Sequence, residues 1–130
     1  MIVCVAGMHR SGTSMVARVL ALCGLYLGPD DAMLPPAPDN PEGFWEHADF
    51  MRLNDAVLDA VGGAWDVPPP LVWPAAPELA ELREEATALA ARFAGRRAWG
   101  WKDPRNSLTL PFWRQVLPDL RTVVCLRNPI

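Results

Sequence analysis

Residues 2–14 constrain the fold more than any other part of this sequence. An apolar run at residues 2–6 leads directly into a segment that begins at Gly7, contains Gly12 and passes into a helical pattern. This order predicts a strand, a glycine-bounded loop and a helix. Such a loop points several backbone N–H groups and a helix N-terminus at one place, where a phosphate or sulfate oxygen can bind. The sequence therefore predicts a site for an anionic, nucleotide-like group; alternatively, the glycines only form a tight turn.

The loop lacks the lysine that nucleoside-triphosphate enzymes place at its end. Their pattern, G-x-x-x-x-G-K-[ST], requires lysine where this chain has Thr13. Arg10 instead brings positive charge from within the loop. We therefore expect a loop that holds one phosphate group and is poorly built to hold three.

Strands and helices alternate along the rest of the chain. Apolar residues at helical spacing predict helices over residues 12–22, 46–61, 78–94 and 108–117, with Gly24 and Gly95 as stops. Residues 98–101 are predicted to form a short strand and residues 122–126 a buried one. Proline-rich loops occupy residues 28–41 and residues 65–77. The first of these loops could form a gate or a wall of the site, or be a plain connector. The order predicts an α/β fold, a three-layer parallel sheet with flanking helices as in P-loop NTPases.

Polar residues follow each predicted strand. The strands end at Gly7, at Lys102 and Asp103, and at Arg127, and ligands of such sheets bind beyond the carboxyl ends of the strands. A nucleoside-triphosphate enzyme usually ends the strand that corresponds to the third one here in an acidic residue that holds Mg²⁺. In this chain that strand ends in Arg127, so we expect no metal. The guanidinium fork of Arg127 suits a phosphate, although it could simply cap the strand edge.

Four segments resemble, in the same order, the sulfotransferases that use 3′-phosphoadenosine 5′-phosphosulfate (PAPS). Residues 10–14 match the signature [KR]-S-G-[TS]-[TS], and the other three segments are residues 40–46, 100–105 and 126–129. Within this family, the four segments together are most similar to the bacterial branch related to tyrosylprotein and carbohydrate sulfotransferases. The resemblance implies PAPS as donor co-substrate and transfer of its sulfuryl group to an acceptor hydroxyl or amine.

The resemblance also implies a donor site. Lys102 matches the catalytic lysine of the family, and Arg127 matches its arginine for the 3′-phosphate. The donor-binding candidates are Arg10, Ser11, Gly12, Thr13, Ser14, Arg105 and Arg127. Lys102 and Arg10 are also catalytic candidates because sulfuryl transfer needs positive charge near the leaving phosphate. Asp103 could instead pair with Lys102 or Arg105 and be purely structural.

Sulfuryl transfer also requires a general base. Glu46 is the first choice, because the family places an acidic residue after the matching segment and at the start of a helix. A carboxylate there could instead only stabilise the helix N-terminus through the macrodipole. His47 and His9 are the alternatives; we expect His47 to face solvent and His9 to shape the loop.

Composition favours a soluble, cytoplasmic protein without a nucleic-acid or membrane partner. The chain is 51% hydrophobic and 21% charged, with a formal net charge of −3. We find no targeting segment, and the apolar stretch at residues 15–27 is interrupted by Arg18 and too short to span a bilayer. The three cysteines, Cys4, Cys23 and Cys125, show no pairing pattern and are expected to be reduced and buried.

We interpret residues 1–130 as the N-terminal part of a single sulfotransferase domain, inactive alone, because three strands are few and the last matching segment stops at Pro129. A P-loop kinase of a small molecule, with Mg²⁺ on Asp103, and a non-catalytic nucleotide-binding module are the alternatives. The acceptor stays open among small-molecule, carbohydrate and tyrosine hydroxyls, and so does the oligomeric state. Trp45, Trp65 and Trp73, which lie beside the proline-rich loops, could form an acceptor wall or pack in the core.

Overall fold

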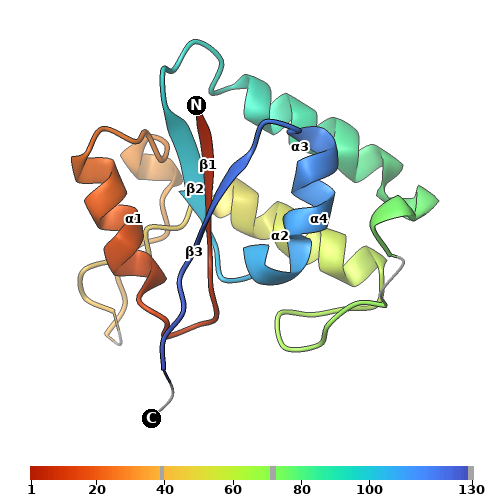
Figure 1. Ribbon diagram of the computed structural model, residues 1–130, viewed down its shortest axis with the longest axis horizontal. Coiled ribbons are helices and arrows are strands. Elements are labelled where there is room, and N and C mark those ends of the chain that lie inside the picture. Colours follow the sequence, from red (N-terminus) through yellow and green to blue (C-terminus); the bar gives the residue numbers. More distant parts are fainter. Residues whose placement is uncertain (39, 71–72, 129–130) are drawn as a thin grey trace.

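The computed structural model describes residues 1–38, 40–70 and 73–128. Asp39, Leu71, Val72, Pro129 and Ile130 lie outside the described residues, so parts of both proline-rich loops and the last residue of the fourth matching segment do too. The described chain is an α/β structure with a small parallel sheet and flanking helices (Figure 1).

The sheet contains β1 (Ile2–Ala6), β2 (Trp99–Lys102) and β3 (Arg121–Val124) in the order β2-β1-β3. Both neighbours pair with β1 in parallel, and Val3 lies opposite Gly100 on one side and Arg121 on the other. The central place of β1 agrees with its apolar sequence, since a strand with neighbours on both sides and helices on both faces is shielded from water. All three carboxyl ends therefore lie at one edge of the sheet.

Four helices cover the two faces of the sheet (Figure 1). Helix α1 (Thr13–Leu22) covers one face. The other face is covered by α2 (Ala48–Ala60), α3 (Ala80–Ala91) and α4 (Asn106–Val116). Three short 3₁₀ turns, Asp30–Ala32, Trp73–Ala75 and Pro77–Leu79, lie in the connections.

An aromatic core joins the sheet to α2, α3 and α4. The Phe50 ring stacks on Trp101 with centroids 4.5 Å apart, and Trp101 lies 4.7 Å from Trp113. A smaller cluster under α1 contains Val3, Ala17, Leu25 and Leu27. Burial of such large apolar side chains is the main force that fixes the helices on the sheet, and it anchors the segments on which the polar residues lie.

The predicted elements are confirmed, with shifted ends. Helix α2 begins after His47, which is its N-cap residue. A 3₁₀ turn precedes α3 and includes the predicted start of that helix. Helix α4 begins earlier than predicted, at Asn106. Gly24 directly follows the C-cap of α1 and has φ of +95°, the left-handed conformation typical of residues that end helices. Helix α3 ends at Ala91, before the predicted stop at Gly95.

Two expectations of burial are wrong. Strand β3 was expected to be buried, but Arg121 and Val124 are exposed and Val124 has 58% of its surface open. It lies at the sheet edge, and among the described residues only β1 pairs with it. Cys23, the C-cap residue of α1, is exposed, whereas Cys4 and Cys125 are buried as expected; all three are free thiols.

Candidate anion-binding and transfer site

A cleft of about 310 Å³ opens at the carboxyl edge of the sheet. It brings together the loop after β1, the ends of β2 and β3, and the segment before α2. Its lining residues are His9, Arg10, Gly12, Thr13, Ser14, Asn40, Phe44, Glu46, Lys102, Pro104 and Arg127. Seven of the nine predicted site residues, all but Ser11 and Arg105, are therefore neighbours in space, although they come from four separate parts of the sequence.

The loop between β1 and α1 turns sharply before the helix begins. Arg10 and Gly12 have φ of 67° and 85°, and the Ser11 N–H donates to the Met8 carbonyl at 3.1 Å. Gly7 is required for close packing, because a Cβ there would lie 2.7 Å from the Cys125 carbonyl oxygen. No side-chain hydrogen bond caps α1 at Gly12. The free N–H groups of the first turn of α1 thus accompany Gly12, Thr13 and Ser14 at the cleft, a suitable place for an anion.

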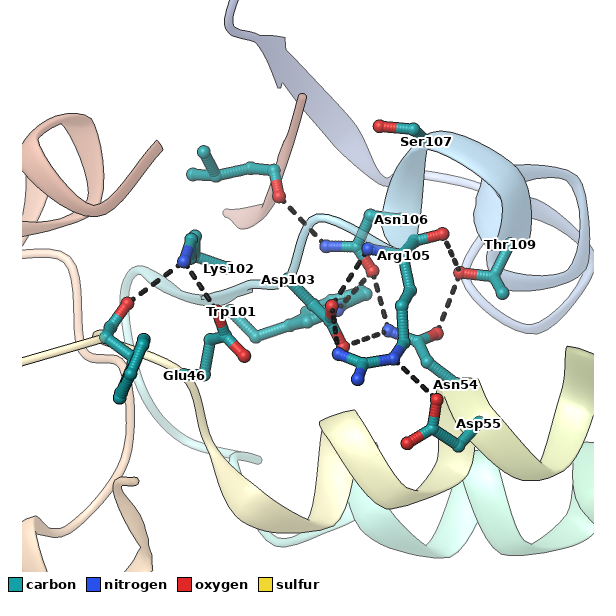
Figure 2. Close-up of polar contacts among 12 residues, drawn as sticks. Glu46, Asn54, Asp55, Trp101, Lys102, Asp103, Arg105, Asn106, Ser107 and Thr109 are labelled. Atoms are coloured by element: carbon teal, nitrogen blue, oxygen red, sulfur yellow. Dashed lines mark hydrogen bonds and ion pairs between the residues drawn. The ribbon is translucent and has the colours of Figure 1, made fainter. Parts of the chain in front are cut away.

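Lys102 lines the cleft and is held there by three oxygen atoms; Figure 2 draws its contact with Glu46. Its Nζ donates to Glu46 Oε1 at 2.6 Å, to the Phe44 carbonyl at 3.1 Å and to Ser14 Oγ at 3.3 Å. The side chains of Lys102 and Glu46 are 3% and 9% exposed. An ammonium has three donors, and here each has an acceptor. The predicted catalytic lysine and the predicted base are thus one buried ion pair.

Two further cations lie at the mouth of the cleft. Arg127 is exposed, and its NH1 donates to the Arg10 carbonyl at 3.3 Å, which connects the end of β3 to the loop. Within the part of the chain that the structure describes, the exposed Arg10 guanidinium has no hydrogen-bond or ion-pair partner. With Lys102 and Glu46 included, and histidine neutral, the cleft carries an excess of positive charge that favours an anionic ligand.

Arg105 lies outside the lining of the cleft and is held by carboxylates. Its Nε donates to Asp55 Oδ1 at 2.5 Å and its NH1 to Asp103 Oδ1 at 3.1 Å (Figure 2). Asp103 is fully buried; burial raises the pKa of its carboxyl group above the ordinary value, while Arg105 acts in the opposite direction. In this arrangement the Asp103 carboxylate is paired with Arg105 and positions that residue.

A buried polar network behind Asp103 escaped prediction. The Asn54 amide on α2 donates to Asp103 Oδ2 at 2.9 Å and to Asn106 Oδ1 at 3.0 Å. Its Oδ1 accepts from Thr109 at 2.7 Å and from Trp113 Nε1 at 2.8 Å. One signal was present in the sequence: Asn54 interrupts the apolar stripe of its helix, between Leu53 and Val57 on the buried face. A polar residue at such a position requires buried partners.

Of the two histidines, His47 differs from expectation in its burial. His9 lines the cleft, and its ring lies edge-on to Trp65 with centroids 5.1 Å apart. His47 was expected to face solvent, which is wrong, because only 1% of its surface is exposed. Its ring packs against Phe50 and Phe93 in the aromatic core. Burial lowers the pKa of His47 below its ordinary value.

The three tryptophans beside the proline-rich loops have different surroundings. Trp45 is half-buried, with φ of 58°, and its Nε1 donates to the Glu42 carbonyl at 3.0 Å. Trp65 is 49% exposed, and Trp73 is buried in the core. The Trp65 ring lies against His9, which lines the cleft.

Comparisons with known protein families, with curated proteins and with solved structures found no match. No helix in the described ranges is long and apolar enough to cross a membrane. Within the same ranges, no group of three or more histidine, cysteine, aspartate or glutamate side chains could hold a metal ion.

Proposed function

We propose that this protein is the donor-binding part of a sulfotransferase that uses PAPS, with a fold of the P-loop type. One observation carries the proposal: the buried pair of Lys102 and Glu46 opens into the cleft that the glycine loop, Arg10 and Arg127 surround. A sulfuryl transferase needs an anion site, a cation near the transferred group and a base near the acceptor. The four sequence segments that resemble the family supply these groups.

The donor would bind along the cleft through its charged groups. The loop, the N-terminus of α1 and Arg10 would hold the 5′-phosphosulfate, and Arg127 would take the 3′-phosphate. Lys102 is placed to approach a sulfonyl oxygen or the bridging oxygen. Ser14, which contacts Lys102 Nζ, would adjust the position of the ammonium.

The transfer step moves a sulfuryl group between two oxygens (or from an oxygen to a nitrogen). The acceptor atom forms a bond to sulfur and gives its proton to the Glu46 carboxylate, while the bond between sulfur and the bridging oxygen breaks. Adenosine 3′,5′-bisphosphate leaves with the electron pair of that bond, and Lys102 and Arg10 offset its charge. For this step Lys102 must turn from Glu46 toward the donor, because a carboxylate that is bound to an ammonium is a weak base.

The kinase alternative has less support from the geometry. Its metal would need Asp103, but both oxygens of that carboxylate already accept hydrogen bonds, from Arg105 and Asn54. Thr13 in place of the loop lysine also argues for a single phosphate group. A non-catalytic binding module would keep the anion site and lack turnover.

Isothermal titration calorimetry tests the proposal directly. Adenosine 3′,5′-bisphosphate should bind without Mg²⁺ and bind more tightly than ATP does with Mg²⁺. Tighter, Mg²⁺-dependent binding of ATP would overturn the proposal in favour of the kinase. In the full-length protein, binding of the bisphosphate without any transfer from PAPS to a panel of phenols, sugars and amines would favour the non-catalytic module.

A further inference from the structure

His47 connects the aromatic core to the start of α2. It is the N-cap residue of α2, with φ −84° and ψ 125°, and its Nδ1 accepts a hydrogen bond from the Asp49 N–H at 3.2 Å. A nitrogen that accepts cannot carry a proton, so the ring is neutral, with its proton on Nε2. Nε2 is buried, and the described part of the chain offers it no hydrogen-bond partner. The ring is therefore built into the fold as a neutral cap.

Histidine is an unusual residue for this purpose. Serine, threonine, aspartate and asparagine are the common N-caps, because a short side chain reaches the free N–H groups easily. Here the ring also fills space: its centroid lies 5.4 Å from that of Phe50 and 5.7 Å from that of Phe93. On its other side the chain approaches so closely that a Cβ on Gly28 would lie 2.5 Å from His47 Cδ2. The imidazole thus both caps the helix and packs in the core.

Glu46 is the residue directly before this cap. Its carbonyl accepts a hydrogen bond from the Leu34 N–H at 2.8 Å, and the next carbonyl, that of His47, accepts one from the Met51 N–H in the capped helix at 3.0 Å. Both restraints act directly after the Cα from which the Glu46 side chain reaches Lys102. Loss of the cap would loosen one of them and leave the other.

We propose that His47 is a positioning residue: by capping α2 through Nδ1 it fixes the Glu46 carboxylate on Lys102. The role of this pair in transfer rests on the proposed function, but the positioning itself does not. Two charged groups act on the ring, Asp49 on α2 and Arg92, the C-cap residue of α3, and they bind each other through Arg92 NH1 and Asp49 Oδ2 at 2.6 Å. Their opposite charges largely offset each other, so the cap depends on the ring nitrogen itself.

Lys102 provides a probe of the pair that needs no ligand. It is the only lysine in the sequence, so an amine-reactive acylating reagent can label only Lys102 and the N-terminal amine. In the folded protein Lys102 is 3% exposed and should react slowly, at a rate set by local opening of its surroundings. Mass spectrometry of the two labelled peptides measures both rates, with the N-terminal amine as the internal reference.

Two substitutions separate capping from packing. His47→Asn keeps a cap acceptor but removes the ring from the core, and His47→Leu fills the core but has no acceptor. At pH 8, His47→Leu should label Lys102 about fivefold faster than wild type, as expected for loss of one cap, and His47→Asn should stay near wild type. Thermal melts check that each variant is folded at the labelling temperature.

A purely structural role in the core predicts the opposite order, with His47→Asn the faster variant, and that result would overturn the proposal. Equal rates in the two variants, whether raised or unchanged, would overturn it as well, because the cap acceptor would then make no difference. The experiment involves neither adenosine 3′,5′-bisphosphate nor turnover. Failure of the proposed function would appear only in calorimetry and would leave this result intact.

Discussion

Lys102 stands apart among the cationic residues, because the other eleven are all arginine. A planar guanidinium could not place its donors on Glu46, Ser14 and the Phe44 carbonyl as the compact ammonium does. A buried pair of this kind contributes little net stability, since desolvation of both charges offsets their attraction. The proposed transfer chemistry, rather than folding stability, would account for its position in the cleft.

The charge of Arg10 is expected to contribute to binding of a phosphorylated ligand. Arg10→Ala should weaken the affinity for adenosine 3′,5′-bisphosphate by about 1.5–3 kcal/mol, the usual value of a hydrogen bond to a charged group, measured by calorimetry. Arg121→Ala is the matched control, because it removes the same charge at the opposite end of β3. If Arg121→Ala weakened the affinity as much as Arg10→Ala does, the affinity would depend on the net charge of the protein rather than on the loop.

Glu46 is expected to act as the base. In the full-length enzyme, Glu46→Gln should lower kcat by about 10²–10⁴-fold, the range for loss of a general base, with little change in donor affinity. Glu42→Gln is the matched control. Glu42 lies on the same segment as Glu46, but its carboxylate is exposed and paired with Arg18, so this variant should leave kcat unchanged. A Glu46→Gln variant with nearly normal kcat and a lower melting temperature would show that the carboxylate only supports Lys102 and the helix start.

The sequence predicted which residues gather at the cleft better than how they are bound. Strand ends of a parallel sheet meet at one edge, and this rule was enough to bring Arg10, Lys102 and Arg127 together. Side-chain partners depend on distances of a few ångströms between segments far apart in the chain. The contact of Arg105 with Asp55 spans fifty residues, and no local pattern encodes it.

At the scale of elements, helix α2 is fixed to α4 by the polar network around Asn54 as well as by apolar packing. Asn54→Leu would remove one hydrogen bond each from Asp103 and Thr109, which keep their contacts with Arg105, and would take from the buried Trp113 Nε1 its partner among the described residues. Unfolding in urea should then require about 2–4 kcal/mol less free energy than for wild type. Gln115→Leu, an amide on the exposed surface of α4, should change it by less than ~0.5 kcal/mol.

The same experiment can refute the importance of the network. Apolar side chains sometimes replace buried polar groups at no cost when they fill the space well. An Asn54→Leu protein as stable as wild type would mean that Asp103 and its neighbours rearrange to satisfy one another.

Element positions could be predicted from periodicity, whereas their ends and exposure could not. The apolar stripe of residues 50, 53, 57 and 58 placed α2 correctly, because a helix must bury such a stripe. Its first residue is decided by the His47 cap, and histidine is not among the residues that usually signal a cap. The β-branched sequence of β3 indicated a strand but not its place in the sheet, which depends on long-range pairing.

At the scale of the whole molecule, His47 should make stability depend on pH. Burial lowers the pKa of its ring below the ordinary value of 6.5. Below pH 6.5 the unfolded chain therefore binds a proton at this residue that the folded protein does not, and stability falls as the pH falls. Between pH 6.5 and 5.5 the free energy of unfolding should decrease by at most about 1 kcal/mol from this residue.

Urea unfolding at pH 7.5, 6.5 and 5.5 measures this dependence, and the comparison of variants isolates its source. His47→Asn cannot take up the proton and should lose the decrease, whereas His9→Gln should keep it. Two carboxyl groups with shifted pKa values do not interfere with this comparison. The pKa of Asp49 is lowered by Arg92, so its effect on stability appears below pH 3.8. The pKa of Asp103 is raised by burial, and its effect is the same in every variant. If His9→Gln removed the pH dependence and His47→Asn kept it, the titrating residue would be the histidine of the cleft, and the cap of α2 would not respond to pH.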